Sequence, residues 1–263
     1  MDGLNTVLEV NNITIQFGAL KANNNVTFNA KKGEFLGLIG PNGAGKTTIF
    51  NAMTGGVKPT EGEILLNGVS ILNKRPDQRC HMGISRTYQN IRLFPQMTVE
   101  ENVEIGLHAT PEYSRFAAFL GTPIVKRKNK ECKEKARKLL ERFDLYQFKD
   151  MKAGNLPYGV QRKLEIARAL ATDPKLLLLD EPAAGMNNDE CNELVSLLKK
   201  VHKDFNLTTI LIEHHIDLVV QLCDRICVLN LGEILTEGIP SEVQSNPKVI
   251  SAYLGNRRLK NNG

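Results

Sequence analysis

The nine residues "GPNGAGKTT" at 40–48 constrain this chain more than any other stretch. They fit the pattern G-x-x-x-x-G-K-[ST], directly follow the apolar run "LGLIG", and open the helical-looking "KTTIFNAMTG". The three glycines let consecutive backbone amides point inward at a helix N-terminus, whose positive dipole end favours an anion. We therefore expect a polyphosphate cradle in which Lys46 neutralises the outer phosphates and Thr47 holds Mg2+. A glycine-rich turn alone would not require the Lys-Thr pair.

A second stretch, "KLLLLDEP" at 175–182, places two acids at the end of an apolar run. In α/β proteins the carboxyl ends of buried strands are where ligands bind. Burying two carboxylates there without a cation would be unfavourable. We interpret Asp180 as a residue on the magnesium side and Glu181 as the general base that polarises the attacking water. The plainer alternative is a strand that ends in a charged turn.

The order of apolar patterns indicates an α/β fold. Runs such as "VLEVNNITIQF" and "EGEILLNGVSI" predict strands in the first part of the chain. Residues 98–151 change to helical periods, with a Thr cap at the start of "TVEENVEIGLHA" and a stripe of Ala136, Leu139, Leu140 and Phe143. Strands such as "TTILIEH" then alternate with helical stretches such as "NDECNELVSLLKKVHKDF". This predicts a parallel α/β core with a helical insert.

Composition narrows the function classes. The chain has 263 residues, of which 41 % are hydrophobic and 24 % charged, with a formal charge of +5, as in ordinary globular proteins. The basic runs at 126–138 and 257–260 are most simply solvated surfaces. A nucleic-acid site would interleave such residues with aromatic ones, which make up only 6 % of the chain, so a nucleic-acid partner is disfavoured. The start is short and polar, and no apolar stretch approaches the roughly 20 residues that span a bilayer, so we expect a cytoplasmic chain.

The five cysteines are scattered and form no C-x-x-C pair, which disfavours disulfides and zinc. Cys223 and Cys227 are spaced to share a helix face. We expect two small buried hydrophobic side chains there rather than a metal or redox site.

Several motifs together resemble one family. The phosphate loop, "YQN" at 88–90, "LPYGVQRKLEIARAL" at 156–170, "LLLLDEP", "AGMN" and "LIEHH" occur in the order and approximate spacing of an ABC transporter ATPase subunit. This resemblance covers nearly the whole chain. It implies a P-loop ATPase core with a parallel sheet, an antiparallel β subdomain and a helical subdomain. The implied division is 1–90, a helical region 91–165, the rest of the core 166–240, and a tail 241–263.

The resemblance also implies roles for individual residues. The catalytic residues would be Glu181, the switch histidine His214 and the glutamine-loop residue Gln89. Magnesium would be held by Thr47, Gln89 and Asp180. Phe17 would stack on the adenine of ATP. The phosphate loop would bind its phosphates through Gly40, Pro41, Asn42, Gly43, Ala44, Gly45, Lys46, Thr47 and Thr48. The signature at 154–162 would bind ATP across a dimer interface through Tyr158 and Gly159.

Within the family the chain looks most like an ATPase subunit of the branched-chain amino acid importers. Three features favour this: "RTYQNIRLFPQMTVEENV" at 86–103, the segment from Gly106 to Lys126, and the ending "NPKVISAYLG" at 246–255. The implied partners are two transmembrane permease subunits, a second ABC ATPase in a homo- or heterodimer and, indirectly, an external substrate-binding protein. The implied place is the cytoplasmic face of the inner membrane, as a peripheral subunit.

Other functions stay open. Urea or amide importers and the lipopolysaccharide-export ATPase also resemble this chain, although the export ATPase typically lacks such an insert. A soluble ABC ATPase acting on DNA or the ribosome is a rival class, but the stretch between Lys46 and Leu156 is too short for the long coiled coil of the repair members. A nucleotide-binding regulator that does not hydrolyse ATP is the third class. The presence of Glu181, Gln89 and His214 argues against it.

The chain departs from the family pattern at the signature, which usually reads Leu-Ser-Gly-Gly-Gln. Here Pro157, Tyr158 and Val160 replace Ser, Gly and Gln. Pro157 lacks a hydroxyl and an amide hydrogen, but proline suits the first position of a helix, and Gly159 still offers an unobstructed amide. Asn187 and His215 stand where Asp is common, which removes negative charge at both positions.

Overall fold

The computed structural model describes residues 5–108 and 123–260. The strands are β1 (Thr6–Phe17), β2 (Leu20–Lys31), β3 (Phe35–Ile39), β4 (Glu61–Leu66), β5 (Val69–Ser70), β6 (Ile84–Arg86), β7 (Leu176–Asp180), β8 (Thr208–Ile212), β9 (Arg225–Asn230) and β10 (Glu233–Gly238). The α-helices are α1 (Lys46–Thr54), α2 (Pro76–His81), α3 (Val99–Leu107), α5 (Pro123–Arg142), α6 (Tyr158–Leu170), α7 (Asn188–Phe205), α8 (Ile216–Leu222), α9 (Pro240–Ser245) and α10 (Pro247–Lys260). Short 3-10 helices are η2 (Tyr146–Phe148) and η3 (Ala153–Asn155).

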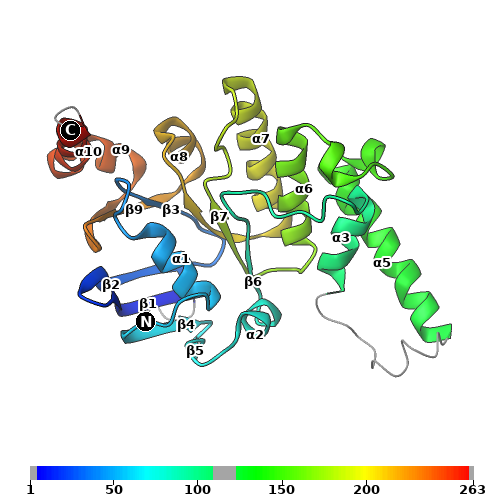
Figure 1. Cartoon of the computed structure of the whole chain (residues 1–263), viewed down its shortest axis with the longest axis horizontal. Helices are drawn as coiled ribbons and strands as arrows, with labels where there is room; N and C mark the ends of the chain where they lie inside the picture. Colours follow the sequence, from blue (N-terminus) through cyan, green and yellow to red (C-terminus); the bar gives the residue numbers. More distant parts are fainter. Residues whose placement is uncertain (1–4, 109–122, 261–263) are drawn as a thin grey trace. The chain divides into compact units, whose positions relative to one another are not determined.

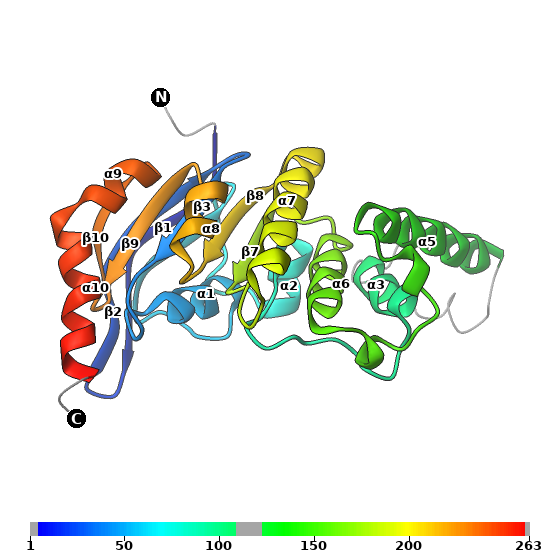
Figure 2. The same ribbon diagram turned by 90° about the horizontal axis from the view of Figure 1, so that it is seen from above.

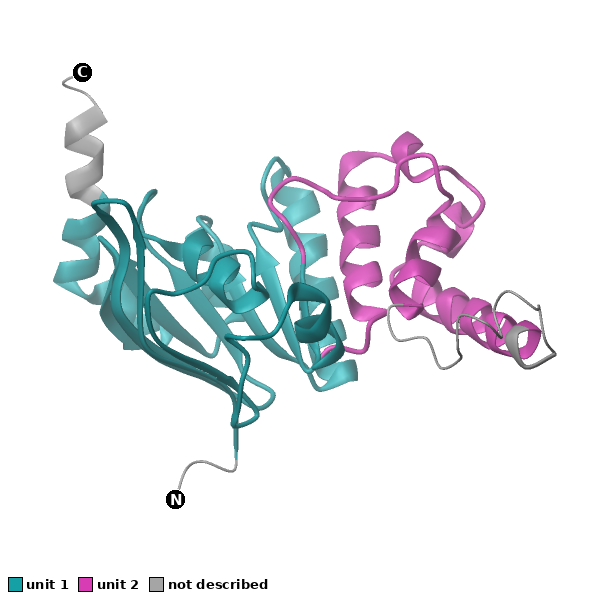
Figure 3. Cartoon of the chain, turned by 60° about the horizontal axis from the view of Figure 1, so that its bottom comes forward, with its two compact units in different colours: residues 1–86, 175–263 teal, residues 87–174 magenta. Residues whose placement is uncertain are grey.

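The chain forms two compact units, coloured separately in Figure 3. The first combines Met1–Arg86 with Lys175–Gly263, and the second is Thr87–Pro174. The second unit therefore interrupts the first, and it contains the whole helical region predicted at 91–165.

The first unit holds both sheets. An antiparallel sheet has the order β2-β1-β4-β5, and a second sheet has the order β10-β9-β3-β8-β7-β6. In the second sheet β9, β3, β8, β7 and β6 run parallel, and β10 pairs antiparallel with β9. Helix α1 lies between the two sheets (Figures 1 and 2). The predicted parallel α/β core and antiparallel β subdomain are thus confirmed.

The apolar runs are buried because both faces of the central strands are covered. Every residue of β3, β7 and β8 is buried, as continuous apolar strands of parallel sheets usually are. Leu36 and Leu38 of β3 join one core cluster with Ile49 and Phe50 of α1 and with β1, β2 and β4. This packing fixes the carboxyl end of β3, and therefore the start of the glycine-rich loop, against α1.

The helices of the second unit follow the predicted patterns. Thr98 caps α3, since its side chain accepts from the amide of Glu101 at 3.1 Å, while the Glu101 carboxylate accepts from the amide of Thr98. The predicted stripe on α5 and its continuation is buried, at Ala136, Leu139, Leu140 and Phe143. Of the segment from Gly106 to Lys126, which favoured the branched-chain amino acid importers, residues 109–122 lie outside the described residues.

The structure corrects one prediction about the cysteines. Cys223 and Cys227 do not share a helix face, because Cys223 follows the end of α8 and Cys227 lies in β9. Both are buried, and burial raises the pKa of both thiols well above its usual range. Their spacing of four suggested a helix, but α8 ends at Leu222 and β9 begins at Arg225.

Candidate active site

The glycine-rich loop joins β3 to α1 in a conformation that requires its glycines. Gly40, Gly43 and Gly45 have φ values of 153°, 81° and 98°. A Cβ at Gly40 would lie 2.0 Å from the carbonyl oxygen of Leu229, and one at Gly45 would lie 2.5 Å from that of Ala22. Since Gly45 is the N-cap of α1, no side-chain cap competes for the amides of the first helical turn. The loop is thus a backbone cradle of the kind that binds phosphate.

Lys46 supplies the positive charge of this cradle. It is buried, and its ammonium donates to the carbonyl oxygens of Gly40 at 2.7 Å and Pro41 at 3.0 Å. Burial lowers the pKa of Lys46, while the carboxylates of Glu181 and Asp180 act in the opposite direction. The ammonium therefore belongs electrostatically to the same site as the two predicted acids. Thr47, the predicted magnesium ligand, is exposed on the first turn of α1.

Asp180 ends β7 and is buried against Arg86, which ends β6. The guanidinium Nη2 lies 2.6 Å from the Asp180 carboxylate, and the two side chains are only 5 % and 4 % exposed. Nη1 of Arg86 also donates to Asn51 of α1 at 2.7 Å. The cation that we expected beside the acids is thus supplied to Asp180 by the protein itself, whereas Glu181 is not fully buried, with 16 % of its side chain exposed. Sequence reasoning missed Arg86, although a basic residue at the end of a short apolar stretch was an available signal.

Glu181 and His214, assigned separately from the sequence, meet in the structure. Nε2 of His214 lies 2.9 Å from Oε1 of Glu181. Glu181 has φ 47°, a left-handed conformation that is unfavourable by about 1–2 kcal/mol for a residue with a Cβ. Its amide is held by the carbonyl of Ile212 at 2.9 Å. A strained conformation persists only where the surrounding structure holds it, and such residues cluster at functional sites.

Glu213 organises the backbone around this pair. Its carboxylate is 1 % exposed and accepts from the amides of Ala183 at 2.8 Å and His214 at 2.9 Å. It thereby joins the loop after β7 to the loop after β8. Sequence reasoning also missed this residue; a buried acid directly after an apolar strand was the available signal.

Phe17 ends β1 and is 51 % exposed, so it is not a core residue. It belongs to the hairpin whose second strand passes the phosphate loop at Ala22 and Asn23, where the Asn23 amide donates to the carbonyl of Gly45 at 3.4 Å. An exposed ring on this hairpin is available to stack on a base.

Gln89, Tyr158 and Gly159 belong to the second unit. Gln89 is exposed, and Tyr158 is 43 % exposed as the first residue of α6. The prediction that Pro157 occupies the first helical position is wrong by one residue: Pro157 is the N-cap, with φ −55° and ψ 151°. Its fixed φ still suits the entry into the helix.

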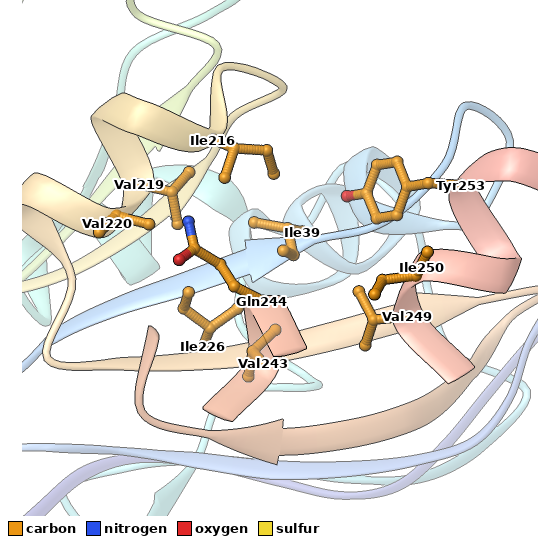
Figure 4. Close-up of a pocket in the computed structure, with 10 residues that line it drawn as sticks. All are labelled: Ile39, Ile216, Val219, Val220, Ile226, Val243, Gln244, Val249, Ile250 and Tyr253. Atoms are coloured by element: carbon orange, nitrogen blue, oxygen red, sulfur yellow. The ribbon is translucent and has the colours of Figure 1, made fainter. Parts of the chain in front are cut away.

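A separate concavity of the first unit has a different character. A cavity of about 350 Å³ lies among β3, β9, α8, α9 and α10 (Figure 4). Its lining is apolar except for Gln244 and Tyr253, and burial raises the pKa of Tyr253 to about 12. No charged side chain lines this cavity, so it is not suited to bind phosphate. The candidate active site is instead the glycine-rich cradle, which begins at Gly40, directly after the lining residue Ile39.

Comparison with known proteins shows the family of this chain. The family description "ABC transporter" matches residues 23–184, and "Branched-chain amino acid ATP-binding cassette transporter" matches residues 233–258. The chain is 45 % identical to the high-affinity branched-chain amino acid transport ATP-binding protein LivG of Salmonella typhimurium, over 95 % of this chain and 98 % of that protein.

Two solved structures are also similar. A nucleotide-free ATP-binding cassette of an ABC transporter has a TM-score of 0.82 at 35 % identity, covering 94 % of this chain and 98 % of that one. A dimeric cassette in a post-hydrolysis state, bound to ADP and Pi, has a TM-score of 0.74 at 28 % identity, covering 89 % of this chain and 98 % of that one.

The fold and the site define a P-loop ATPase: a glycine cradle with a buried lysine, and a strand-end acid in contact with a histidine. This chain belongs to the ABC transporter family and is one of its ATP-binding, ATP-hydrolysing cassettes. In the part of the chain that the structure describes, no helix combines the length and apolar character needed to cross a membrane.

Proposed function

We propose that this chain is the ATPase subunit of an importer for branched-chain amino acids, working at the cytoplasmic face of the membrane. The contact between Glu181 and His214 carries the ATPase part of the proposal. Similarity to LivG over 95 % of the chain and the family match at 233–258 support the substrate class. The proposed partners are two permease subunits, a second cassette in a homo- or heterodimer, and an external binding protein that acts indirectly.

In the proposed mechanism, the cradle binds the phosphates of ATP. The amides at the start of α1 receive the phosphate oxygens, and Lys46 exchanges its contacts to Gly40 and Pro41 for the outer phosphates. Phe17 stacks on the adenine. We assign Tyr158 and Gly159, at the start of α6, to ATP held by the partner cassette.

Glu181 is the proposed general base. A carboxylate oxygen takes the proton of the attacking water, and His214 Nε2, at 2.9 Å from Oε1, fixes the orientation of that carboxylate. Glu213 in turn fixes the main chain at His214. General-base catalysis contributes about 10²- to 10⁴-fold to a rate, which sets the scale for removing it.

The residues present fit a magnesium ion. Asp180 is a buried carboxylate already compensated by a cation, and the hydroxyl of Thr47 lies on the first turn of α1. When bound, Mg2+ supplies positive charge that stabilises the phosphates and the leaving group. Thr47 and Asp180 would hold it, together with Gln89 as the family resemblance implies.

Glu181→Gln tests the assigned base. The variant should lower the turnover of ATP at least about 100-fold, because an amide cannot take the proton, while ATP binding is retained. Phosphate release and equilibrium binding of a labelled nucleotide measure the two effects. Normal turnover in this variant would remove Glu181 from its proposed role.

Reconstituted transport tests the substrate. The chain should copurify with two permease subunits, and vesicles containing the complex should take up labelled leucine, isoleucine or valine when ATP and the binding protein are supplied. Glu181→Gln in the same complex is the control for ATP dependence. Uptake of urea in place of these amino acids would contradict the proposal.

A further inference from the structure

A buried ion pair on α6 is not explained by the residues assigned so far. Arg162 and Glu165 lie one turn apart, and their side chains are 0 % and 1 % exposed. Arg162 Nη1 lies 2.7 Å from Oε2 of Glu165. Removing two charges from water is unfavourable unless further hydrogen bonds satisfy the remaining donors and acceptors. Their other partners therefore indicate what the pair does.

Those partners are main-chain groups of one short segment. Arg162 donates through Nη1 to the carbonyl of Tyr88 at 2.6 Å and through Nη2 to the carbonyl of Gln89 at 2.7 Å. Oε1 of Glu165 accepts from the amide of Arg92 at 3.1 Å and from that of Tyr88 at 3.4 Å. Arg162 thus binds carbonyl groups of the segment 88–92, and Glu165 binds its amide groups. Because the guanidinium is planar, it also fixes the direction of the two carbonyls.

Arg162 also contacts the start of its own helix. Nη2 donates to the hydroxyl of Tyr158 at 3.1 Å, and the guanidinium carbon lies 5.8 Å from the centre of the Tyr158 ring. One buried guanidinium therefore joins the first residue of α6 to the carbonyl of Gln89.

We infer that Arg162 and Glu165 are positioning residues for ATP hydrolysis. They hold the main chain at 88–92, so that the side chain of Gln89 is presented from a fixed backbone. This inference rests on the proposed function, because it assumes that Gln89 acts on the bound ATP. Neither residue touches the nucleotide in this role; both act through the conformation of the segment.

The experiment compares Arg162→Lys and Glu165→Ala with Ile166→Val in the assembled transporter. Lysine keeps the charge but not the planar pair of donors, and alanine removes the acceptor of two amides. Ile166→Val removes a buried carbon of the same helix and no hydrogen bond. Each kcat is measured at the same interval below the variant's own Tm, which removes the effect of general destabilisation.

The two polar variants should lower kcat about tenfold or more with little change in the KM for ATP, because a small misplacement of a catalytic group has large effects on rate. Ile166→Val should keep most of its kcat. Glu165→Gln should recover much of the rate lost in Glu165→Ala, because its amide oxygen still accepts a hydrogen bond. A loss of kcat no larger than that of Ile166→Val, or a rise in KM at constant kcat, would overturn the inference.

Hydrogen exchange provides a readout that does not depend on the transported solute. The amides of Tyr88 and Arg92 should exchange at least about tenfold faster in Glu165→Ala than in Ile166→Val. Unchanged exchange would contradict the inference even if the transporter moves branched-chain amino acids. Transport of another solute would contradict the proposed function and leave this comparison intact.

Discussion

Each unit of the molecule buries an arginine-carboxylate pair, and the two pairs differ in their surroundings. Arg86 and Asp180 meet at 2.6 Å at the ends of neighbouring strands, and Asp180 influences the ammonium of Lys46. Arg162 and Glu165 meet at 2.7 Å on one helix, where both hold main-chain atoms. The Arg86–Asp180 pair lies beside the expected phosphate site. The Arg162–Glu165 pair forms its other hydrogen bonds with main-chain groups of the protein.

This difference separates two uses of buried charge. A pair beside a phosphate cradle can redistribute its interactions when a ligand brings new charges, whereas a pair satisfied by amides and carbonyls is fixed by the fold. We therefore expect changes at the first pair to depend on nucleotide and changes at the second to be independent of it.

Asp180→Asn should have the largest effect. It leaves the guanidinium of Arg86 buried without its anionic partner, so the free energy of unfolding should fall by about 3–5 kcal/mol. Turnover should also fall strongly, because a proposed magnesium residue is lost. Urea unfolding and phosphate release, each with and without Mg2+ and ATP, measure both.

In Glu165→Gln the loss of stability should be the same with and without nucleotide. An equal dependence on nucleotide in Asp180→Asn and Glu165→Gln would break the distinction between the two pairs.

Gly45→Ala tests the cradle without changing any charge. The new Cβ would lie 2.5 Å from the carbonyl oxygen of Ala22 and impose a left-handed φ of 98° on alanine. We expect a loss of more than about 1–2 kcal/mol in the free energy of unfolding and weaker nucleotide binding. Gly18→Ala is the matched control, because its φ is 58° and nothing lies within 4 Å of the added Cβ. Equal losses in the two variants, measured by urea unfolding, would show that the close approach at Gly45 is unimportant.

Asn187 should show the smallest effect. Its side chain accepts from the amide of Glu190 at 3.0 Å, and the Glu190 carboxylate accepts from the amide of Asn187 at 3.0 Å, so it caps α7. Asn and Asp are comparable caps, so Asn187→Asp should change stability by only a few tenths of a kcal/mol, and Asn187→Ala should cost about 1 kcal/mol. Thermal unfolding measures both. A large change in turnover for Asn187→Asp would mean that the missing charge matters for catalysis.

Local patterns were enough to predict the elements of the site. The glycine spacing before Lys46 specified the cradle, because a loop with left-handed residues needs glycines at those positions. The apolar run before Asp180 specified a strand buried on both faces, and the Thr98 capping box specified the start of α3. Such signals act over a few neighbouring residues, so they can be recognised in the sequence alone.

Only the tertiary structure decided which charges meet. Arg86 finds Asp180 across 94 positions, and Arg162 finds the carbonyl of Tyr88 across 74, because parallel strands and packed helices bring distant segments together. The left-handed conformation of Glu181 likewise depends on the neighbouring strand β8. The sequence by itself determined the family, the cradle and the candidate acids; the fold decided how each buried charge is compensated, because that depends on contacts between segments far apart in the chain.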